Sequence, residues 1–147
     1  MPKVSIVRAS EWFALKGWKP FPFQKEAWSC FRDGCDGMVN APTGSGKTFS
    51  LMLPMLEAIH DTPSKGLRAI WITPIRALTK EIQGSAEKAI EGMGLNLTVG
   101  VRTGDTPSKI KQAQKKKMPD ILITTPESLH VLFSNKGYQG LFKNLLG

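Results

Sequence analysis

The sequence predicts an α/β fold in which helices cover both faces of a parallel sheet. Short apolar runs of strand length alternate along the chain with longer segments of helical period. The runs end repeatedly at turn residues or at residues that start helices. A glycine-rich stretch also stands between one such run and the helical segment that follows it. This order is typical of a doubly wound parallel sheet.

The elements follow one another in a regular order. The pattern predicts four strands, at residues 37–40, 67–73, 97–104 and 121–125. It predicts helices at 24–31, 49–60, 75–92 and 128–133, the second of them despite Pro54. The run LRAIWIT at 67–73 is continuously apolar, as in strands buried on both faces of a parallel sheet.

An aromatic-rich segment precedes the predicted sheet. Its rings are Trp12, Phe13, Trp18, Phe21 and Phe23. For most of them we expect core packing. We therefore divide the chain into a lead-in, residues 1–36, and an α/β domain that begins at residue 37.

Composition limits the classes of partner. The chain has 147 residues, a formal charge of +8 and a sequence pI of about 9.7, which favours polyanions such as nucleic acid. No apolar stretch has the length of a membrane span, so we expect a cytoplasmic protein without a membrane partner. Cys30 and Cys35 lack the partner pair of a zinc site and are expected to be reduced thiols. We assign no chemistry to His60 or His130.

The stretch APTGSGKT at 41–48 predicts a phosphate-binding loop. A strand, a glycine-rich turn and a helix start direct backbone N–H groups and the helix dipole at one anion. Ala41 replaces the first glycine of the common pattern and removes no ligand. Lys47 would reach the β- and γ-phosphates, and the Thr48 hydroxyl would bind Mg²⁺; these two are the catalytic candidates. The predicted ATP contacts in the loop are Thr43, Gly44, Ser45, Gly46, Lys47 and Thr48.

Two further residues are candidates for the nucleotide base. The amide of Gln24 offers adenine a donor and an acceptor together, and the Phe21 ring offers a stacking surface. Gln24 has an equal alternative interpretation as the polar N-terminal residue of a helix.

Three polar loops follow predicted strands: TPIRAL at 73–78, RTGDT at 102–106 and TPES at 125–128. Open α/β sheets bind ligands at the carboxyl ends of their strands, so the loops predict a groove. In TPES, helix capping by Thr125 or Ser128 is an alternative. Residues 102–117 also contain six basic side chains against one acid, Asp105. That cluster is either a solvated face or a surface that attracts a nucleic-acid backbone.

Together FPFQ, APTGSGKT, TPIRALT, RTGDT and TTPESL resemble the leading motifs of superfamily 2 DEAD/DEAH-type helicases. The amino-acid sequence of residues 66–133 is most similar to the Lhr-like branch, and within it to the bacterial ligase-associated DEXH-box DNA helicases. The resemblance implies a P-loop NTPase with an incomplete RecA-like first motor domain. It also implies ATP and Mg²⁺ as cofactors, single-stranded DNA as partner, and a role in DNA repair beside a ligase or nuclease. The implied nucleic-acid contacts are Pro74, Arg76, Ala77, Arg102, Gly104, Asp105, Thr125, Pro126 and Glu127.

The 147 residues contain no Asp-Glu pair, whereas the family carries a DExH box. Phosphoryl transfer needs such acids to hold magnesium and orient water. We expect this chain alone to bind nucleotide weakly and not to hydrolyse it, and an uncovered sheet edge to favour instability or association. Two alternatives stay open. One is a P-loop enzyme that binds no nucleic acid, and the other is a nucleic-acid-binding module with a vestigial loop.

Overall fold

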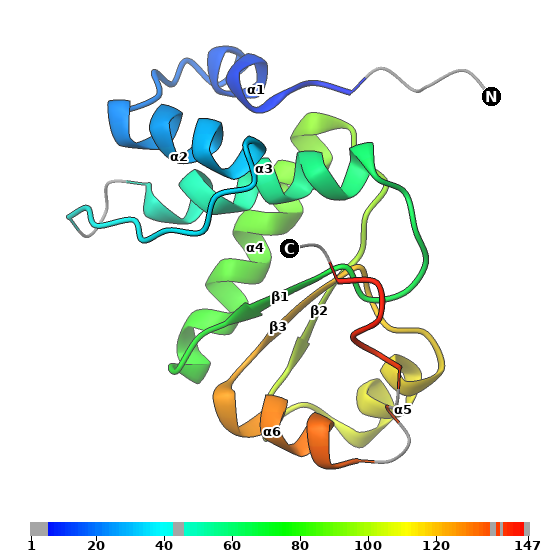
Figure 1. Cartoon of the computed structure of the whole chain (residues 1–147). Coiled ribbons are helices and arrows are strands. Elements are labelled where there is room, and N and C mark those ends of the chain that lie inside the picture. Colours follow the sequence, from blue (N-terminus) through cyan, green and yellow to red (C-terminus); the bar gives the residue numbers. More distant parts are fainter. Residues whose placement is uncertain (1–5, 43–45, 136–137, 139, 146–147) are drawn as a thin grey trace. The chain divides into compact units, whose positions relative to one another are not determined.

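The computed structural model describes residues 6–42, 46–135, 138 and 140–145. Within these residues lie six α-helices and three β-strands, labelled in chain order in Figure 1. The chain forms two compact units. The first unit comprises Met1–Thr62 and Lys88–Asn96, and the second comprises Pro63–Glu87 and Leu97–Gly147. The predicted domain boundary at residue 36 stays a prediction.

The first unit is helical and contains α1 (Ala9–Leu15), α2 (Pro22–Arg32), α3 (Lys47–Asp61) and the end of α4. Its core is aromatic, but of the five lead-in rings Trp12 and Phe13 alone are buried, so the expected core packing holds for fewer than half of them. Phe13 lies edge-on to Trp18 and Trp28, with ring centroids 5.4 and 5.3 Å apart. Phe49 of α3 contacts Trp12 in the same way. Trp12, Phe13 and Trp28 are buried, whereas Phe21 is 54% exposed and lies outside this core.

Helix α3 begins two residues before the predicted start and continues through Pro54. Its start is set by Gly46, whose φ of 83° only glycine adopts readily. Pro54 is buried on the same helix as the apolar residues Met52, Leu53 and Leu56. Burial of that apolar side compensates for the backbone hydrogen bond that proline cannot donate.

A buried carboxylate attaches the start of α1 to α3. Glu57 is 5% exposed, and its Oε1 accepts a hydrogen bond of 2.7 Å from the backbone N–H of Ala9. The guanidinium of Arg32 lies 3.3 Å from its Oε2. On the surface Arg8 donates two hydrogen bonds to Asp61, and hydrogen bonding to this carboxylate raises the pKa of the Arg8 guanidinium. The contacts of Arg8 and Ala9 join segments that are 53 and 48 residues apart in sequence.

The second unit contains a parallel sheet with the strand order β1-β3-β2. The strands are β1 (Ala69–Ile72), β2 (Val99–Arg102) and β3 (Ile121–Thr124). Their register pairs Thr124 at the end of β3 with Ile72 on one side and Arg102 on the other. All three strands therefore end at the same level. Beneath the sheet, Leu122 packs in a core cluster with Leu67, Leu132 and Tyr138.

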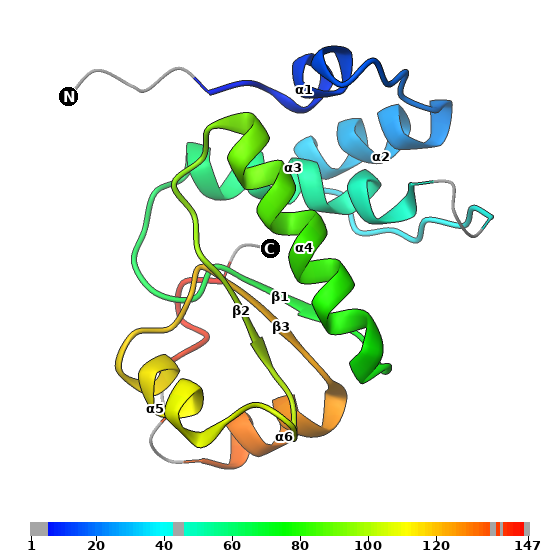
Figure 2. The same ribbon diagram turned by 180° about the vertical axis from the view of Figure 1, so that it is seen from behind.

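Three helices follow the strands: α4 (Arg76–Met93), α5 (Ser108–Lys116) and α6 (Pro126–Ser134). Figures 1 and 2 show α5 and α6 on the opposite side of the sheet from the first part of α4. The prediction of a parallel sheet with helices on both faces is confirmed. Each strand run was predicted too long, because its last residues form the turn or cap before the next helix.

The strand predicted at 37–40 is wrong. Residues 35–42 have no regular secondary structure, and none of the described strands pairs with them. The run has only two apolar residues, and one of them, Met38, is 92% exposed. A strand needs a hydrogen-bonded neighbour, which this segment lacks within the described part of the chain. Among the described helices, none has the length and apolarity needed to cross a membrane.

Candidate functional site

The phosphate-binding loop leads into α3 through Gly46, in the first unit. The left-handed backbone at Gly46 turns the chain directly into the helix, so that Lys47 is its first residue. Lys47 is exposed and Thr48 is half-buried, at a helix N-terminus whose first turn has no acid. This arrangement suits an anion, since free backbone N–H groups and the helix dipole are both located there. The predicted contacts Thr43, Gly44 and Ser45 lie outside the described residues.

Gln24 joins helix α2 to this loop. The side chain is 2% exposed, and its Oε1 accepts a hydrogen bond of 2.9 Å from the backbone N–H of Phe21. Its Nε2 donates to the backbone oxygen of Gly46 at 3.1 Å. Gln24 thus lies in the first turn of α2, as the alternative interpretation predicts. It also contacts the predicted nucleotide loop. Its role toward adenine stays a prediction.

The approach of Gln24 to Gly46 is close. A Cβ atom at position 46 would stand 2.6 Å from the Gln24 amide nitrogen, so the Gln24 side chain fits here because residue 46 is a glycine. A second hydrogen bond joins α2 to α3: the Trp28 indole N–H donates to the backbone oxygen of Phe49 at 3.0 Å. Phe21 stacks on Phe23 with a centroid distance of 6.0 Å. The Phe21 ring is exposed and is therefore accessible to the aromatic ring of a ligand.

Thr48 fits the predicted Mg²⁺ role by its position after Lys47, where phosphate oxygens would supply the remaining negative ligands. In the part of the chain that is described, no three His, Cys, Asp or Glu side chains gather closely enough to bind a metal ion.

In the second unit, the three polar loops leave the sheet at one edge, as predicted. After β1, the backbone N–H of Thr73 still donates to Thr124, and α4 then starts at Arg76. After β2, Thr103 is buried and forms a turn: its Oγ1 accepts from Asp105 N–H, and its own N–H donates to Thr106 Oγ1. These bonds hold Gly104 and Asp105 outward into solvent.

A groove of about 660 Å³ joins the first two of these loops. It brings together the predicted residues Arg76, Ala77 and Asp105. The Arg76 guanidinium lies 3.2 Å from the Asp105 carboxylate, and both side chains are more than half exposed. A Cβ atom at Gly104 would come within 2.9 Å of the Arg76 guanidinium. Pro74 is exposed beside this groove on the β1–α4 loop.

The third loop is a helix cap. Thr125 is 2% exposed, and its Oγ1 accepts from the backbone N–H of Ser128 at 3.4 Å. The capping alternative is therefore present in the structure. Pro126 and Glu127 form the exposed first turn of α6 at the same sheet edge. Their predicted contact with nucleic acid stays a prediction.

Arg102, like Thr125, is buried, unlike the other predicted nucleic-acid contacts. It is 7% exposed, its guanidinium carbon lies 4.8 Å from the centre of the Tyr138 ring, and its Nη1 donates to Gln114 at 3.3 Å. The Arg102 side chain extends from β2, packs against α5 and Tyr138, and does not line the groove. Stacking of the guanidinium on the Tyr138 ring and the hydrogen bond to the Gln114 side chain compensate for the burial of the Arg102 charge.

The groove also contains residues that the motifs did not indicate. They include Lys80, Gln83, Pro107 and Ile110. Lys80 lies one helical turn after Arg76, and this spacing of two basic residues was a readable signal. Ile110 is 47% exposed on a lysine-rich helix, and sequence alone gave no reason to place it in a groove.

Comparisons with known proteins show the family of this chain. The family model of the DEAD/DEAH box helicases matches residues 21–146. The Lhr helicase/probable uracil glycosylase of Mycolicibacterium smegmatis is 35% identical over 144 residues, covering 89% of this chain and 10% of the relative. A solved structure of Mycobacterium smegmatis helicase Lhr bound to ssDNA and AMP-PNP has a TM-score of 0.80 at 34% identity, covering 92% and 18%.

A second solved structure, the DUF1998 helicase MrfA bound to DNA and AMPPNP, has a TM-score of 0.81 at 28% identity. It matches 92% of this chain, which covers 19% of that structure's chain. The chain thus spans between a tenth and a fifth of the length of these relatives. With a family model that covers most of its residues and Lhr helicases among its relatives, this chain belongs to the DEAD/DEAH box helicases.

Proposed function

We propose that this chain is the ATP-binding N-terminal part of an ATP-dependent DNA helicase or translocase. The observation that carries the proposal is the common level at which the three strands end. It places the β1–α4 and β2–α5 loops around one groove, and the start of α6 at the same edge. A sheet edge with three helix-starting loops suits a phosphodiester strand, because each loop offers polar atoms at a regular spacing.

ATP binds at the start of α3 in this proposal. Lys47 contacts the β- and γ-phosphates, Thr48 contacts magnesium, and the backbone of the glycine loop surrounds the phosphates. The solved Lhr and MrfA structures were obtained with AMP-PNP, a nucleotide, which supports this assignment. For adenine recognition, the Gln24 amide offers a second N–H on Nε2 and a second lone pair on Oε1 beside its two intramolecular hydrogen bonds. Phe21 stacks on the base from its exposed position.

Single-stranded DNA binds along the strand ends. Arg76 supplies the charge in the groove, while Pro74, Ala77, Gly104 and Asp105 shape its wall. Thr125, Pro126 and Glu127 extend the contact at α6. Asp105 pairs with Arg76 in the free protein, so DNA binding exchanges a carboxylate partner for a phosphate. The solved Lhr structure contains ssDNA, which supports this choice of partner.

The lysines of α5 extend the same surface. Lys109, Lys115 and Lys116 are exposed, and the helix contributes Ile110 to the groove. We propose that this helix attracts the phosphate backbone without reading bases. If it is only a solvated face, changing these lysines will leave the salt dependence of DNA binding unchanged.

The remaining proposals concern the parent enzyme. We propose a cytoplasmic motor of DNA repair that works with a ligase or nuclease, on the basis of the Lhr-like motifs. We also propose that the 147 residues do not hydrolyse ATP, because the sequence supplies Lys47 and Thr48 without an Asp-Glu pair. Robust turnover by this chain that is lost in Lys47→Ala would contradict the latter proposal.

Binding of single-stranded DNA as a function of salt tests the proposed function. We expect affinity to fall steeply with salt and to drop roughly tenfold in Arg76→Ala, about the value of one good polar contact. Lys25→Ala on α2 is the control and should have no effect. Absence of salt-sensitive DNA binding by the wild-type chain, with normal ATP binding, would favour a P-loop enzyme that has no nucleic-acid partner.

A further inference from the structure

Helix α2 ends in a specific backbone motif. The backbone N–H of Cys35 donates to the oxygen of Cys30 at 3.0 Å, and the N–H of Gly34 donates to the oxygen of Phe31 at 3.0 Å. Gly34 has a φ of 78° between them. These are the two hydrogen bonds and the left-handed glycine of the Schellman motif. In this motif the residues at the positions of Cys30 and Cys35 commonly contact each other through their side chains.

The printed hydrogen bond limits how far apart the two cysteines can be. A residue's Cα lies about 2.4 Å from its own oxygen and about 1.5 Å from its own nitrogen, so the two Cα atoms are separated by at most about 7 Å. Disulfides usually join Cα atoms about 4.4 to 6.8 Å apart. The backbone therefore already satisfies the main requirement for a bond between Cys30 and Cys35, and rotation of the side chains is the remaining step.

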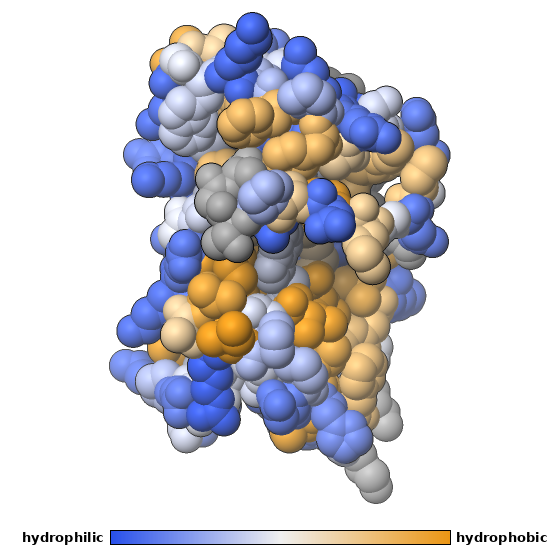
Figure 3. All heavy atoms as spheres, turned by 90° about the vertical axis from the view of Figure 1, so that its left-hand side faces the viewer, coloured by the Kyte–Doolittle hydropathy of each residue, from blue (hydrophilic) through white to orange (hydrophobic). Residues whose placement is uncertain are grey.

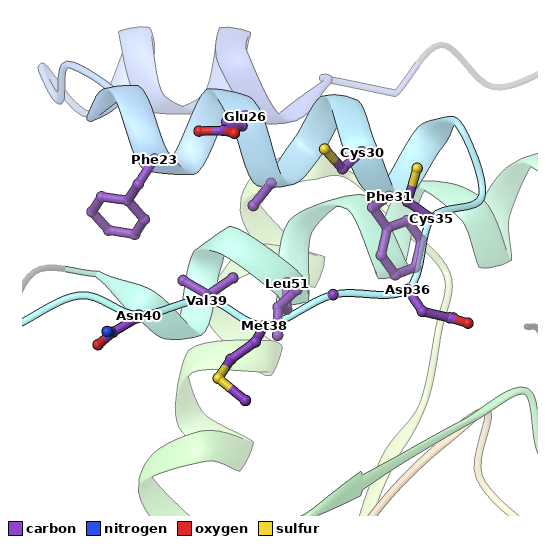
Figure 4. Close-up of a pocket in the computed structure, with 12 residues that line it drawn as sticks. Phe23, Glu26, Cys30, Phe31, Cys35, Asp36, Met38, Val39, Asn40 and Leu51 are labelled. Atoms are coloured by element: carbon purple, nitrogen blue, oxygen red, sulfur yellow. The ribbon is translucent and has the colours of Figure 1, made fainter.

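Both thiols are accessible to a reagent. Cys30 and Cys35 are free and exposed, and they line a groove of about 380 Å³ between α2 and the segment that follows it. Figure 4 shows their sulfur atoms at the same end of α2, on the rim of this groove. Buried structural cysteines are inert, whereas exposed pairs exchange with disulfides in solution.

We propose that Cys30 and Cys35 form a reactive dithiol that is oxidised to an intramolecular disulfide by small-molecule disulfides such as oxidised glutathione. The thiolate of one cysteine attacks the oxidant, forms a mixed disulfide and releases one reduced glutathione. The thiolate of the other cysteine then attacks the protein sulfur and releases the second reduced glutathione. The protein loses two electrons and two protons, and one disulfide molecule is reduced to two thiols.

The position of this bond gives it a structural consequence. It would close a ring across the turn from which the chain runs through residues 36–40 toward the phosphate-binding loop. Met38 in that segment is 92% exposed, and the segment has no regular secondary structure. The disulfide would fix the start of this segment and leave the Gln24 and Trp28 bonds on α2 unchanged.

Intact mass after reaction with excess oxidised glutathione, followed by alkylation of remaining thiols, tests the proposal. The wild-type chain should end lighter by two hydrogen atoms, without attached glutathione or alkyl groups. Cys30→Ser and Cys35→Ser should each keep one glutathione. A wild-type product that carries two glutathiones would overturn the proposal.

The rate of the second step separates the Schellman geometry from mere closeness in sequence. The folded chain should close the ring at least about tenfold faster than the same chain unfolded in urea, since the backbone is already arranged. Gly34→Ala forces a side chain into the left-handed region and should slow closure in the folded state. Gly37→Ala, with open space and no positive φ, should not. Equal closing rates in the folded and unfolded chain would contradict the geometric basis.

Discussion

The two units hold their candidate residues in opposite ways. In the first unit, Gln24 is buried to 2% exposure and both atoms of its amide are bonded within the chain. In the second unit, Arg76 and Asp105 are exposed by 56% and 74% at their side chains and are joined by one ion pair. The nucleotide-side residue is thus fixed by packing. Arg76 and Asp105, which are proposed for DNA, are placed by strand register and remain open to solvent.

This difference indicates where mutations should affect stability and where they should affect binding. Changes in the aromatic and hydrogen-bonded interior of the first unit should lower the free energy of unfolding. Changes at the sheet edge of the second unit should leave it nearly unchanged and alter ligand affinity. Figure 3 shows exposed apolar side chains among hydrophilic ones on one face. Ile72 and Ile75 are exposed apolar residues of the second unit.

The largest contrast is expected from one substitution made at two positions of α4. A Cβ atom at Gly92, in the first unit, would come within 2.0 Å of the Trp12 indole nitrogen. Gly92→Ala should therefore destabilise the chain by about 3 kcal/mol through overpacking. Gly84, in the second unit, has open space. Gly84→Ala should be neutral or stabilising by up to about 1 kcal/mol. Urea unfolding measures both, and equal effects would refute the packing difference.

The buried carboxylate of the first unit gives the next effect. Glu57→Ala removes the acceptor for the Ala9 N–H and the partner of Arg32. We expect a loss of about 2 kcal/mol, since a buried donor is left without its partner. Glu81→Ala, at an exposed position of α4, should stay within about 0.5 kcal/mol of the wild type. A loss in Glu57→Ala no larger than in Glu81→Ala would mean that this carboxylate does not hold α1.

Gln24→Glu tests the role of the Gln24 side-chain amide. The substitution keeps an acceptor for the Phe21 N–H but places a carboxylate oxygen 3.1 Å from the Gly46 oxygen, where a donor stood. We expect a stability loss of about 1 to 2 kcal/mol from this repulsion and weaker nucleotide binding. Gln112→Glu on the exposed surface of α5 is the matched control for charge. Unfolding curves that coincide for the two variants would show that the loop contact is unimportant.

The smallest stability effect is expected at Arg76. Arg76→Ala removes an exposed ion pair, so the free energy of unfolding should change by less than about 0.5 kcal/mol. The same variant should still bind single-stranded DNA more weakly, as proposed above. A stability loss near that of Glu57→Ala would show that the sheet edge depends on this pair and would remove the contrast between the units.

The sequence was informative where a local pattern decides the structure. The runs at 67–73, 97–104 and 121–125 contain the three observed strands, because β-branched and apolar residues suit a sheet buried on both faces. Helix α3 was predicted despite Pro54, since its apolar positions repeat at helical spacing. The common sheet edge also followed from the rule that parallel strands end together.

Sequence reasoning failed where distant contacts decide. The segment 37–40 had the flanking residues of a strand but has no paired neighbour among the described residues. Arg102 looked like its exposed neighbours in RTGDT, yet packing against Tyr138 and Gln114 buries it. The close fit of Gly92 against Trp12 joins residues 80 positions apart, and a lone glycine inside a helical pattern was its only signal.

Magnesium-dependent binding of a fluorescent ATP analogue to the wild-type chain and to Lys47→Ala tests the central claim most directly. Lys47 is exposed at the first residue of α3, so the variant should keep the wild-type melting temperature. We predict binding by the wild-type chain that requires magnesium and is lost in Lys47→Ala. Binding that is equal in the two chains, or absent from a folded wild-type chain, would contradict the assignment of this loop as the nucleotide site.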